Sequence, residues 1–187
     1  MGNQAHTFLF ADIVGFTSLT ATHGDEAAAD LAVRFADHVT LRATEHGAQV
    51  VKTLGDAVMV RGADAAATVE LALRLQDDRS ELGFPGIHVG VNTGPAVSRG
   101  GDWFGTTVNL ASRVADSARA SEVLVTENTL AACGELGDVD VRSLGPQLFK
   151  NMLAATVVYA AERRERPQAD TGREGRFLRL EPAMMPA

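Results

Sequence analysis

Short apolar runs alternate along this chain with longer stretches in which apolar residues recur at helical spacing. The short runs are rich in β-branched residues and have the length of strands. They lie at 6–12, 48–53, 57–61, 87–92, 123–126, 139–144 and 155–161. After the first run, apolar residues recur at every fourth position from Leu31 through Phe35 and Val39 to Ala43. This spacing predicts a helix, and Gly47 is a suitable C-terminal cap for it.

Two more helices are predicted, at 63–78 and 104–118. The first shows the same apolar periodicity, and the second separates two faces. One face holds Val108, Ser112 and Ala115, and the other holds Asn109 and Arg113. The order strand, helix, hairpin, helix, strand predicts an α+β fold, a ferredoxin-like βαββαβ sandwich with additional C-terminal strands.

The composition is that of a soluble domain with a substantial core. The chain has 187 residues, of which 45% are hydrophobic and 22% are charged. Its net charge of −7 argues against a nucleic-acid partner, and no apolar run approaches the ~18 residues of a membrane span. The first residues do not have the pattern of a signal peptide, and Cys133 is the only cysteine, which excludes an internal disulfide. We therefore predict a cytoplasmic protein.

The character of the sequence changes at residue 163. Residues 163–187 are rich in charge and hold three of the six prolines of the chain. Such a composition is typical of a flexible or partner-dependent segment. We therefore expect one globular domain at 1–162, followed by a tail at 163–187.

The stretch FLFADIVGFTSLT, residues 8–20, places the carboxylate of Asp12 at the end of the first predicted strand. One interpretation is a helix cap, because Asp, Ser and Thr are common where a chain enters a helix. The other is that Asp12 is a ligand held at the strand end. The stretch alone leaves both open.

A second carboxylate, Asp56, lies in the turn of a predicted hairpin, VVKTLGDAVMV at 50–60. Gly-Asp is also ordinary turn chemistry. In a ferredoxin-like order, however, the end of the first strand and this hairpin can lie side by side, which would pair Asp12 with Asp56. Two carboxylates without basic neighbours repel each other unless a cation joins them, and their hard oxygen atoms suit Mg²⁺.

Three segments, FADIVGFTSL, KTLGDAVMV and GDWFGTTVNLASRV, resemble the signature segments of class III nucleotidyl cyclases in order and spacing. The resemblance extends over about 7–162 and implies the class III cyclase catalytic fold. It implies that Asp12 and Asp56 hold two divalent ions, Mg²⁺ or Mn²⁺, with the Ile13 carbonyl as a further ligand. It also implies that backbone N–H groups of Gly15, Phe16 and Thr17 bind the polyphosphate, as expected of a turn that opens a helix.

In the same family pattern, Lys52 and Asp102 recognise the purine. Adenine presents an acceptor at N1 and donors at N6. Lysine can only donate hydrogen bonds and ionised aspartate can only accept them, so this pair complements adenine rather than guanine. The nucleotide partner is therefore predicted to be ATP.

The resemblance also assigns roles in the reaction to three polar residues. Asn109 orients the ribose, and Arg113 stabilises charge on the α-phosphate as the 3′-hydroxyl attacks. Lys150 binds the terminal phosphates, although a glycine commonly follows this lysine in the family and Asn151 follows it here. The segment at 95–101 is shorter than the dimerisation arm of many relatives, which predicts altered dimer contacts.

The function implied is an adenylate cyclase that forms 3′,5′-cyclic AMP and pyrophosphate as a homodimer with shared sites. One protomer contributes Asp12 and Asp56; the other contributes Lys52, Asp102, Asn109 and Arg113. A diguanylate cyclase is disfavoured because Trp103 follows Asp102 and because this segment precedes a helix instead of forming a hairpin tip. The remaining alternative is a catalytically weak or inactive cyclase-homology domain that binds nucleotide and regulates a partner. Its usual mark is loss of a metal-binding Asp, the Asn or the Arg, and all of these are present.

Overall fold

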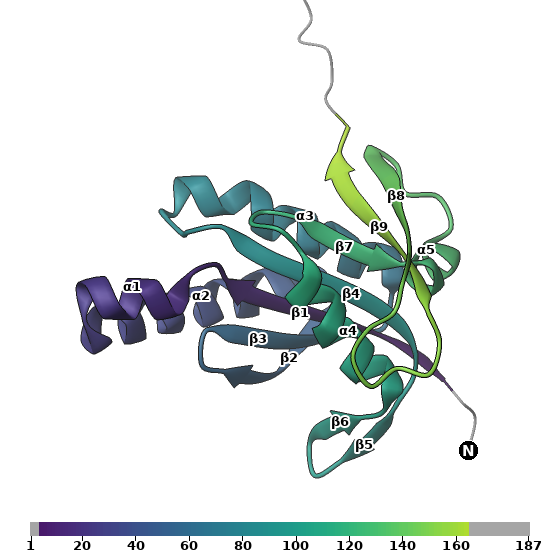
Figure 1. Ribbon diagram of the computed structural model, residues 1–187, viewed down its shortest axis with the longest axis horizontal. Helices are drawn as coiled ribbons and strands as arrows, with labels where there is room; N and C mark the ends of the chain where they lie inside the picture. The colour runs from purple at the N-terminus through teal and green to yellow at the C-terminus, as the bar shows by residue number, and fades with distance from the viewer. Residues whose placement is uncertain (1–3, 165–187) are drawn as a thin grey trace, which may run out of the picture.

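Seven strands of this computed structural model form one mixed sheet, and a two-stranded hairpin stands apart from it (Figure 1). The structure describes residues 4–164, so all but the first two residues of the expected tail at 163–187 lie outside the described part. The strands are β1 (Ala5–Ile13), β2 (Ala48–Leu54), β3 (Ala57–Gly62), β4 (Ile87–Pro95), β7 (Val123–Thr126), β8 (Val139–Gln147) and β9 (Thr156–Arg163). Their order is β2-β3-β1-β4-β7-β9-β8, and only the β4–β7 pair is parallel. The separate hairpin consists of β5 (Val97–Arg99) and β6 (Asp102–Phe104).

Five helices complete the described part of the chain. They are α1 (Phe16–His23), α2 (Asp25–Glu45), α3 (Ala65–Glu81), α4 (Thr106–Ser117) and α5 (Glu127–Cys133). In Figure 1, α4 lies in front of the sheet, and α2 and α3 lie behind it. None of the helices in residues 4–164 is both long and apolar enough to cross a membrane.

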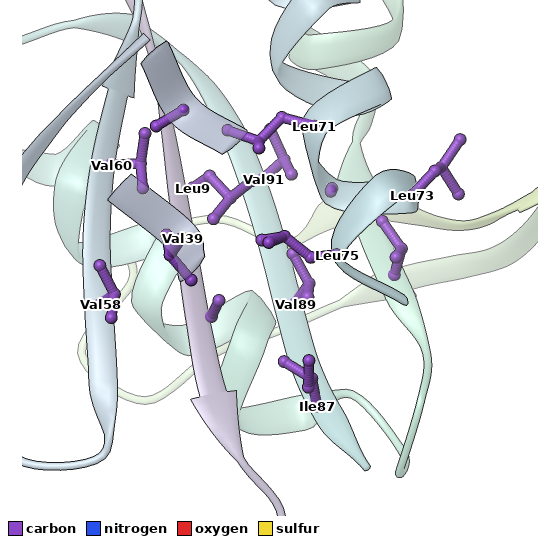
Figure 2. Packing of buried hydrophobic residues seen from close by; sticks show 14 of the residues in the cluster. Leu9, Val39, Val58, Val60, Leu71, Leu73, Leu75, Ile87, Val89 and Val91 are labelled. Atoms are coloured by element: carbon purple, nitrogen blue, oxygen red, sulfur yellow. The ribbon is translucent and has the colours of Figure 1, made fainter. Parts of the chain in front are cut away.

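The larger core lies between the sheet and the helices α2 and α3 (Figure 2). Side chains alternate between the two faces of a strand, so the odd-numbered residues of β1 point to this side. Leu9 of β1, Val60 of β3 and Val39 of α2 are fully buried there. The helical spacing read from the sequence in α2 is thus the apolar stripe that covers the sheet.

The opposite face of the sheet is covered by α4 and carries the candidate site. Phe8 and Phe10 of β1 pack there with Met59 of β3 and Val108 of α4. Helix α4 approaches the sheet closely at Gly90 of β4, where a β-carbon would overlap the backbone of α4. A glycine at this position therefore lets α4 lie directly on the strand.

The predicted fold class is confirmed, and each predicted strand is present with ends that differ by up to three residues. Helices α1 and α5 were not delimited by the sequence pattern, and neither was the β5–β6 hairpin. The expectation that the segment around Asp102 forms no hairpin tip is wrong. Gly100 and Gly101, both with positive φ, form the turn of the β5–β6 hairpin, and Asp102 is the next residue.

Candidate active site

The two acidic residues singled out from the sequence lie together at one end of β1. Asp12 is the penultimate residue of β1 and faces the α4 side, in alternation with Phe8 and Phe10. It pairs with Ala57 across the β1–β3 ladder, and Asp56 is the residue before Ala57 in the β2–β3 turn. The turn is made possible by Gly55, whose φ is 68°. Strand pairing therefore brings the carboxyl group of Asp56 to that of Asp12.

The electrostatics of this pair favour a bound cation. Burial, and then repulsion from Asp56 together with a hydrogen bond to it, raises the pKa of Asp12 to about 6, although His88 opposes the rise. Among residues 4–164, Asp12 Oδ1 is buried and has no hydrogen-bond partner. A buried carboxylate oxygen that lacks a partner is costly unless a ligand satisfies it. The donor set, two carboxylates, fits Mg²⁺ or Mn²⁺.

Protein side chains alone supply only part of such a site. In the described ranges, no three His, Cys, Asp or Glu side chains converge to hold a metal. Mg²⁺ in nucleotide sites is commonly bound by one or two carboxylates, with substrate phosphates completing the coordination. The pair therefore fits an ion that arrives with a phosphate ligand better than a permanently bound structural ion.

The turn after β1 is a helix start without a side-chain cap. Gly15, with φ 71°, is the N-cap residue of α1, and no side chain caps this helix. The interpretation of Asp12 as a helix cap is therefore wrong. Backbone N–H groups in the first turn of a helix, here Phe16 and Thr17, have no intrahelical acceptor and can bind an anion.

A second group joins Lys52 of β2 to Asp102 of β6. Lys52 Nζ donates to Asp102 Oδ2 at 2.6 Å, although the two residues are 50 positions apart. The backbone N–H of Trp103 donates to the other oxygen, Oδ1, at 2.7 Å. The hydrogen bond from Lys52, followed by that from Trp103, lowers the pKa of Asp102, which keeps it ionised. One side chain that can only donate and one that can only accept thus lie side by side.

A third group lines a cavity of about 190 Å³ between α4 and the loop that joins β8 to β9. Its lining residues are Asn109, Ser112, Arg113, Lys150, Asn151 and Met152. Two of these side chains are cationic, so the cavity suits an anion. The predicted helix faces need one correction, because Ser112 lines this cavity with Asn109 and Arg113 instead of joining the apolar face.

A buried polar network fixes the start of α4 and thereby the direction of Asn109 and Arg113. Asn92 of β4 donates to the carbonyl of Thr107 in the first turn of α4 at 2.9 Å. It accepts from the hydroxyl of Thr126 of β7 at 2.7 Å. Both Asn92 and Thr126 are buried, so the bonds are shielded from water.

Ser112 and Asn151 were not among the site residues predicted from the sequence. Ser112 lies three positions after Asn109, a spacing that puts two residues on neighbouring parts of a helix surface and could have identified it. Asn151 has φ 65°, a left-handed conformation that glycine adopts most easily and Asn more readily than most other residues. Asn can therefore replace the glycine that commonly follows this lysine without changing the path of the loop.

Within residues 4–164, the three groups do not line one common cavity. Neither the acidic pair nor the Lys52–Asp102 pair lines the cavity that holds Asn109, Arg113 and Lys150. In Figure 1 the β2–β3 turn lies near α1, whereas the loop between β8 and β9 lies toward the other end of β1.

Comparison with known proteins gives consistent matches. A family model described as "Adenylate and Guanylate cyclase catalytic domain" matches residues 2–153. A pH-sensitive adenylate cyclase of Mycobacterium tuberculosis is 39% identical over 140 residues, which are 74% of this chain and 35% of that protein. An adenylate cyclase of Streptomyces griseus is 42% identical over 117 residues, 62% of this chain and 29% of that protein. The chain thus spans about a third of the length of these relatives.

Solved structures support the same fold. The adenylyl cyclase CyaB of P. aeruginosa superposes with a TM-score of 0.76 at 25% identity, covering 87% of this chain and 95% of that one. The guanylate cyclase domain of RhGC from Catenaria anguillulae, solved with GTP, gives a TM-score of 0.77 at 22% identity and covers 87% of this chain and 98% of that one.

Proposed function

Because this chain belongs to the adenylate and guanylate cyclase catalytic domain family, we propose that it converts ATP to 3′,5′-cyclic AMP and pyrophosphate. The observation that carries the proposal is the pair of Asp12 and Asp56, with a buried oxygen that lacks a partner among the described residues. In a structural role such a pair only destabilises the fold, whereas in a nucleotide site it is half of a cation site. The catalytic unit of this proposal is the domain at 1–162.

The reaction is an intramolecular displacement at the α-phosphorus of ATP. The ribose 3′-oxygen forms a bond to that phosphorus, and the bond from the phosphorus to the oxygen that bridges to the β-phosphate breaks. The hydroxyl proton is released, and the leaving group departs as pyrophosphate. Negative charge increases on the phosphate oxygens during the displacement, so fixed positive charge and hydrogen-bond donors accelerate it.

Different residues of this chain have separate roles in such a site. Arg113 lies against the α-phosphate and stabilises the developing charge, because a guanidinium group is always protonated and matches phosphate geometry. Asn109, one helical turn earlier, orients the ribose. Lys150 and the backbone N–H groups of residues 15–17 hold the terminal phosphates. Asp12 and Asp56, with the Ile13 carbonyl, would hold two divalent ions, Mg²⁺ or Mn²⁺, which supply charge neutralisation on the phosphates.

Base selection rests on the Lys52–Asp102 pair. Lys52 donates to adenine N1, and Asp102 accepts from the N6 amino group. The two side chains bond each other at 2.6 Å in the structure, so each has a partner before the base replaces it. Guanine would face Lys52 with a donor and Asp102 with an acceptor, and each mismatch costs about 1–3 kcal/mol.

The proposed assembly is a homodimer in which each site takes residues from both chains. The separation of the acidic pair from the cavity at Arg113 supports this arrangement, since one chain alone does not surround a nucleotide with all three groups. In such a dimer, one protomer gives Asp12 and Asp56 and its partner gives the purine-binding pair and the cationic cavity.

The test is formation of cyclic AMP by the purified chain with ATP and Mg²⁺ or Mn²⁺. Asp12→Ala and Asp56→Ala should each abolish turnover, whereas Asp140→Ala, at an exposed acid on β8, should retain it. The double variant Lys52→Glu with Asp102→Cys should lose most ATP turnover. Binding of ATP without turnover by the wild-type chain would favour the alternative, a regulatory nucleotide-binding module.

A further inference from the structure

The β5–β6 hairpin carries Asp102 but has little internal support. Each of its strands has three residues, and Val97 and Phe104, which pair at the open end, are 59% and 51% exposed. An isolated hairpin of this size is at best marginally stable in water. The orientation of the Asp102 carboxylate must therefore be fixed by contacts with the rest of the fold.

Apart from the hydrogen bond from Lys52 to Asp102, such contacts are made by Trp103, the residue after Asp102. Its ring lies edge to face with His6 of β1, with centroids 4.4 Å apart and an angle of 62° between the ring planes. It also lies 5.7 Å from the ring of Phe8, and the guanidinium carbon of Arg61 lies over it at 5.3 Å. Both distances are within the range of attractive aromatic and cation–π contacts.

Arg61 and His6 contact each other as well as Trp103. Arg61 Nη2 lies 2.8 Å from His6 Nδ1, and Arg61 Nε donates to the same atom at 3.3 Å. Burial, reinforced by the charge of Arg61, lowers the pKa of His6, which favours the neutral ring that can accept these bonds at Nδ1. Arg61 pairs with Phe8 across the β1–β3 ladder, so the cluster rests on two adjacent interior strands of the sheet.

We propose that Arg61 and His6 are positioning residues for purine recognition, because their contacts hold Trp103 in place and thereby fix the Asp102 carboxylate opposite Lys52. The backbone N–H of Trp103 donates to Asp102 Oδ1, so a shift of the Trp103 backbone moves the carboxylate with it. Neither residue touches the nucleotide in this proposal. The inference rests on the proposed function, since it concerns how the base-reading pair of that site is held.

Removing the contacts of Arg61 and His6 with Trp103 should lower the preference for adenine more than it lowers the rate of the chemical step. Arg61→Ala removes the cation over Trp103 and both bonds to His6, and we expect a five- to tenfold loss of preference for adenine over guanine nucleotides, about the value of one cation–π contact. KM for ATP should rise, and kcat at saturating ATP should change less than twofold. Arg61→Lys keeps the charge but not the planar guanidinium group, and it should give an intermediate loss of selectivity.

Trp103 is the only tryptophan of the chain, so its fluorescence reports on this cluster alone. We would measure acrylamide quenching of the wild-type chain and of Arg61→Ala, Arg61→Lys and His6→Phe. The last variant keeps a ring against Trp103 but removes the acceptor for Arg61. Arg164→Ala is the matched control, because this arginine forms an exposed ion pair with Asp140 at 2.8 Å in another part of the fold.

Selectivity would be measured on the same proteins by the binding of 3′-deoxy-ATP and 3′-deoxy-GTP with Mn²⁺, since nucleotides without a 3′-hydroxyl cannot cyclise. We expect the Arg61 and His6 variants to become more accessible to acrylamide and to lose selectivity together, with Arg164→Ala unchanged. Far-ultraviolet circular dichroism identifies any variant that fails to fold, and the milder Arg61→Lys and His6→Phe then decide the result.

Two results would overturn the inference. In one, quenching is unchanged in the variants, which means that Trp103 is not held by these residues. In the other, quenching rises while selectivity stays at the wild-type value, which means that the cluster does not position Asp102. Failure of the proposed function gives a different result, selective binding of 3′-deoxy-ATP by a wild-type chain that forms no cyclic AMP, and the inference would survive it.

Discussion

Asp12 lies in surroundings that oppose its charge. Burial and the neighbouring Asp56 raise its pKa to about 6, and Oδ1 finds no partner within residues 4–164. An acid whose pKa is higher in the folded than in the unfolded chain destabilises the fold wherever the unfolded chain has it ionised, and this holds at neutral pH. The residue is therefore better explained by a ligand than by the stability of the fold.

Asp12→Asn should separate stability from function. It removes the buried charge and keeps the shape, so we expect cyclic AMP formation to be lost while the free energy of unfolding at neutral pH rises by about 1 kcal/mol, after allowance for solvent screening. Urea denaturation of the two proteins measures the difference. Asp140→Asn, at an exposed ion pair, should change neither quantity. A clear loss of stability in Asp12→Asn would instead indicate a structural role.

Asn151 tests whether backbone conformation or the side chain matters next to Lys150. With φ 65°, Asn151→Gly removes the β-carbon and preserves the loop. Asn151→Ala keeps the β-carbon in the left-handed region without the short polar side chain that lets Asn tolerate this conformation, which costs about 1–2 kcal/mol relative to glycine. We therefore expect Asn151→Ala to raise KM for ATP several-fold through displacement of Lys150, and Asn151→Gly to stay near the wild type. Equal losses in both variants would assign the effect to the amide group.

At the scale of elements, α2 and α3 are joined by a charged cluster around Asp78. This residue of α3 is only 4% exposed, and it accepts from Arg42 Nε at 2.6 Å. Arg74 Nε lies 3.0 Å from its other oxygen. His38 Nε2 lies 3.1 Å from Asp78 Oδ2, although not in hydrogen-bonding geometry. A buried carboxylate with these partners ties the two helices that cover one face of the sheet.

The same cluster predicts how stability depends on pH. Burial lowers the pKa of His38 below its ordinary 6.5; Arg42 adds to this shift, and Asp78 and Glu45 oppose it. A histidine with a lowered pKa contributes stability that is complete above pH 6.5 and is lost as the pH falls below that value. The pKa of His6 is also lowered, so its contribution to stability is likewise lost as the pH falls. We expect these two histidines to lower the free energy of unfolding between about pH 7 and pH 5, whereas protonation of Asp12 opposes this decrease in the same range.

His38→Gln should reduce this decrease by less than about 1 kcal/mol, because glutamine fills the site without titrating. Urea denaturation across the pH series measures it, with His23→Gln at an exposed position of α1 as the control. The attribution fails if His38→Gln and the wild-type chain lose stability in parallel as the pH falls.

The elements show where sequence reasoning succeeds and where it stops. The stripe of α2 and the apolar run of β1 are local patterns, so they predicted these elements, and the ferredoxin-like order of the elements predicted that Asp12 and Asp56 can lie side by side. The β5–β6 hairpin has three residues in each strand, too few for a recognisable period, and α5 has seven residues. The contacts of Trp103 with His6 and Arg61 depend on the folding of that hairpin onto β1 and β3, which no local pattern encodes.

At the scale of the whole molecule, the acidic pair and the cationic cavity are carried by different parts of the chain. Asp12 and Asp56 lie where β1 ends and β2 turns into β3, while Arg113 and Lys150 lie between α4 and the β8–β9 loop. Two copies related by a twofold axis can bring the acidic pair of one chain to the cavity of the other, and symmetry then makes two equivalent sites.

A mixing experiment tests this arrangement. Asp56→Ala and Arg113→Ala should each be inactive alone, because each dimer then has the same defect in both sites. After subunit exchange, the mixed dimer has one site with both defects and one with neither. With random association about half of the dimers are mixed, so activity should recover to about a quarter of the wild-type value.

The matched control is a mixture of Asp56→Ala with Asp12→Ala. Both changes damage the acidic half of the site, so each site of a mixed dimer retains one defect and activity should stay absent. Exchange itself can be followed by energy transfer between labelled subunits. If exchange is complete and the first mixture also stays inactive, the shared site is wrong, and the acidic pair and Arg113 must act within one chain. Recovery in the first mixture alone can arise only if residues of two chains meet at one nucleotide, since neither variant contains a complete set.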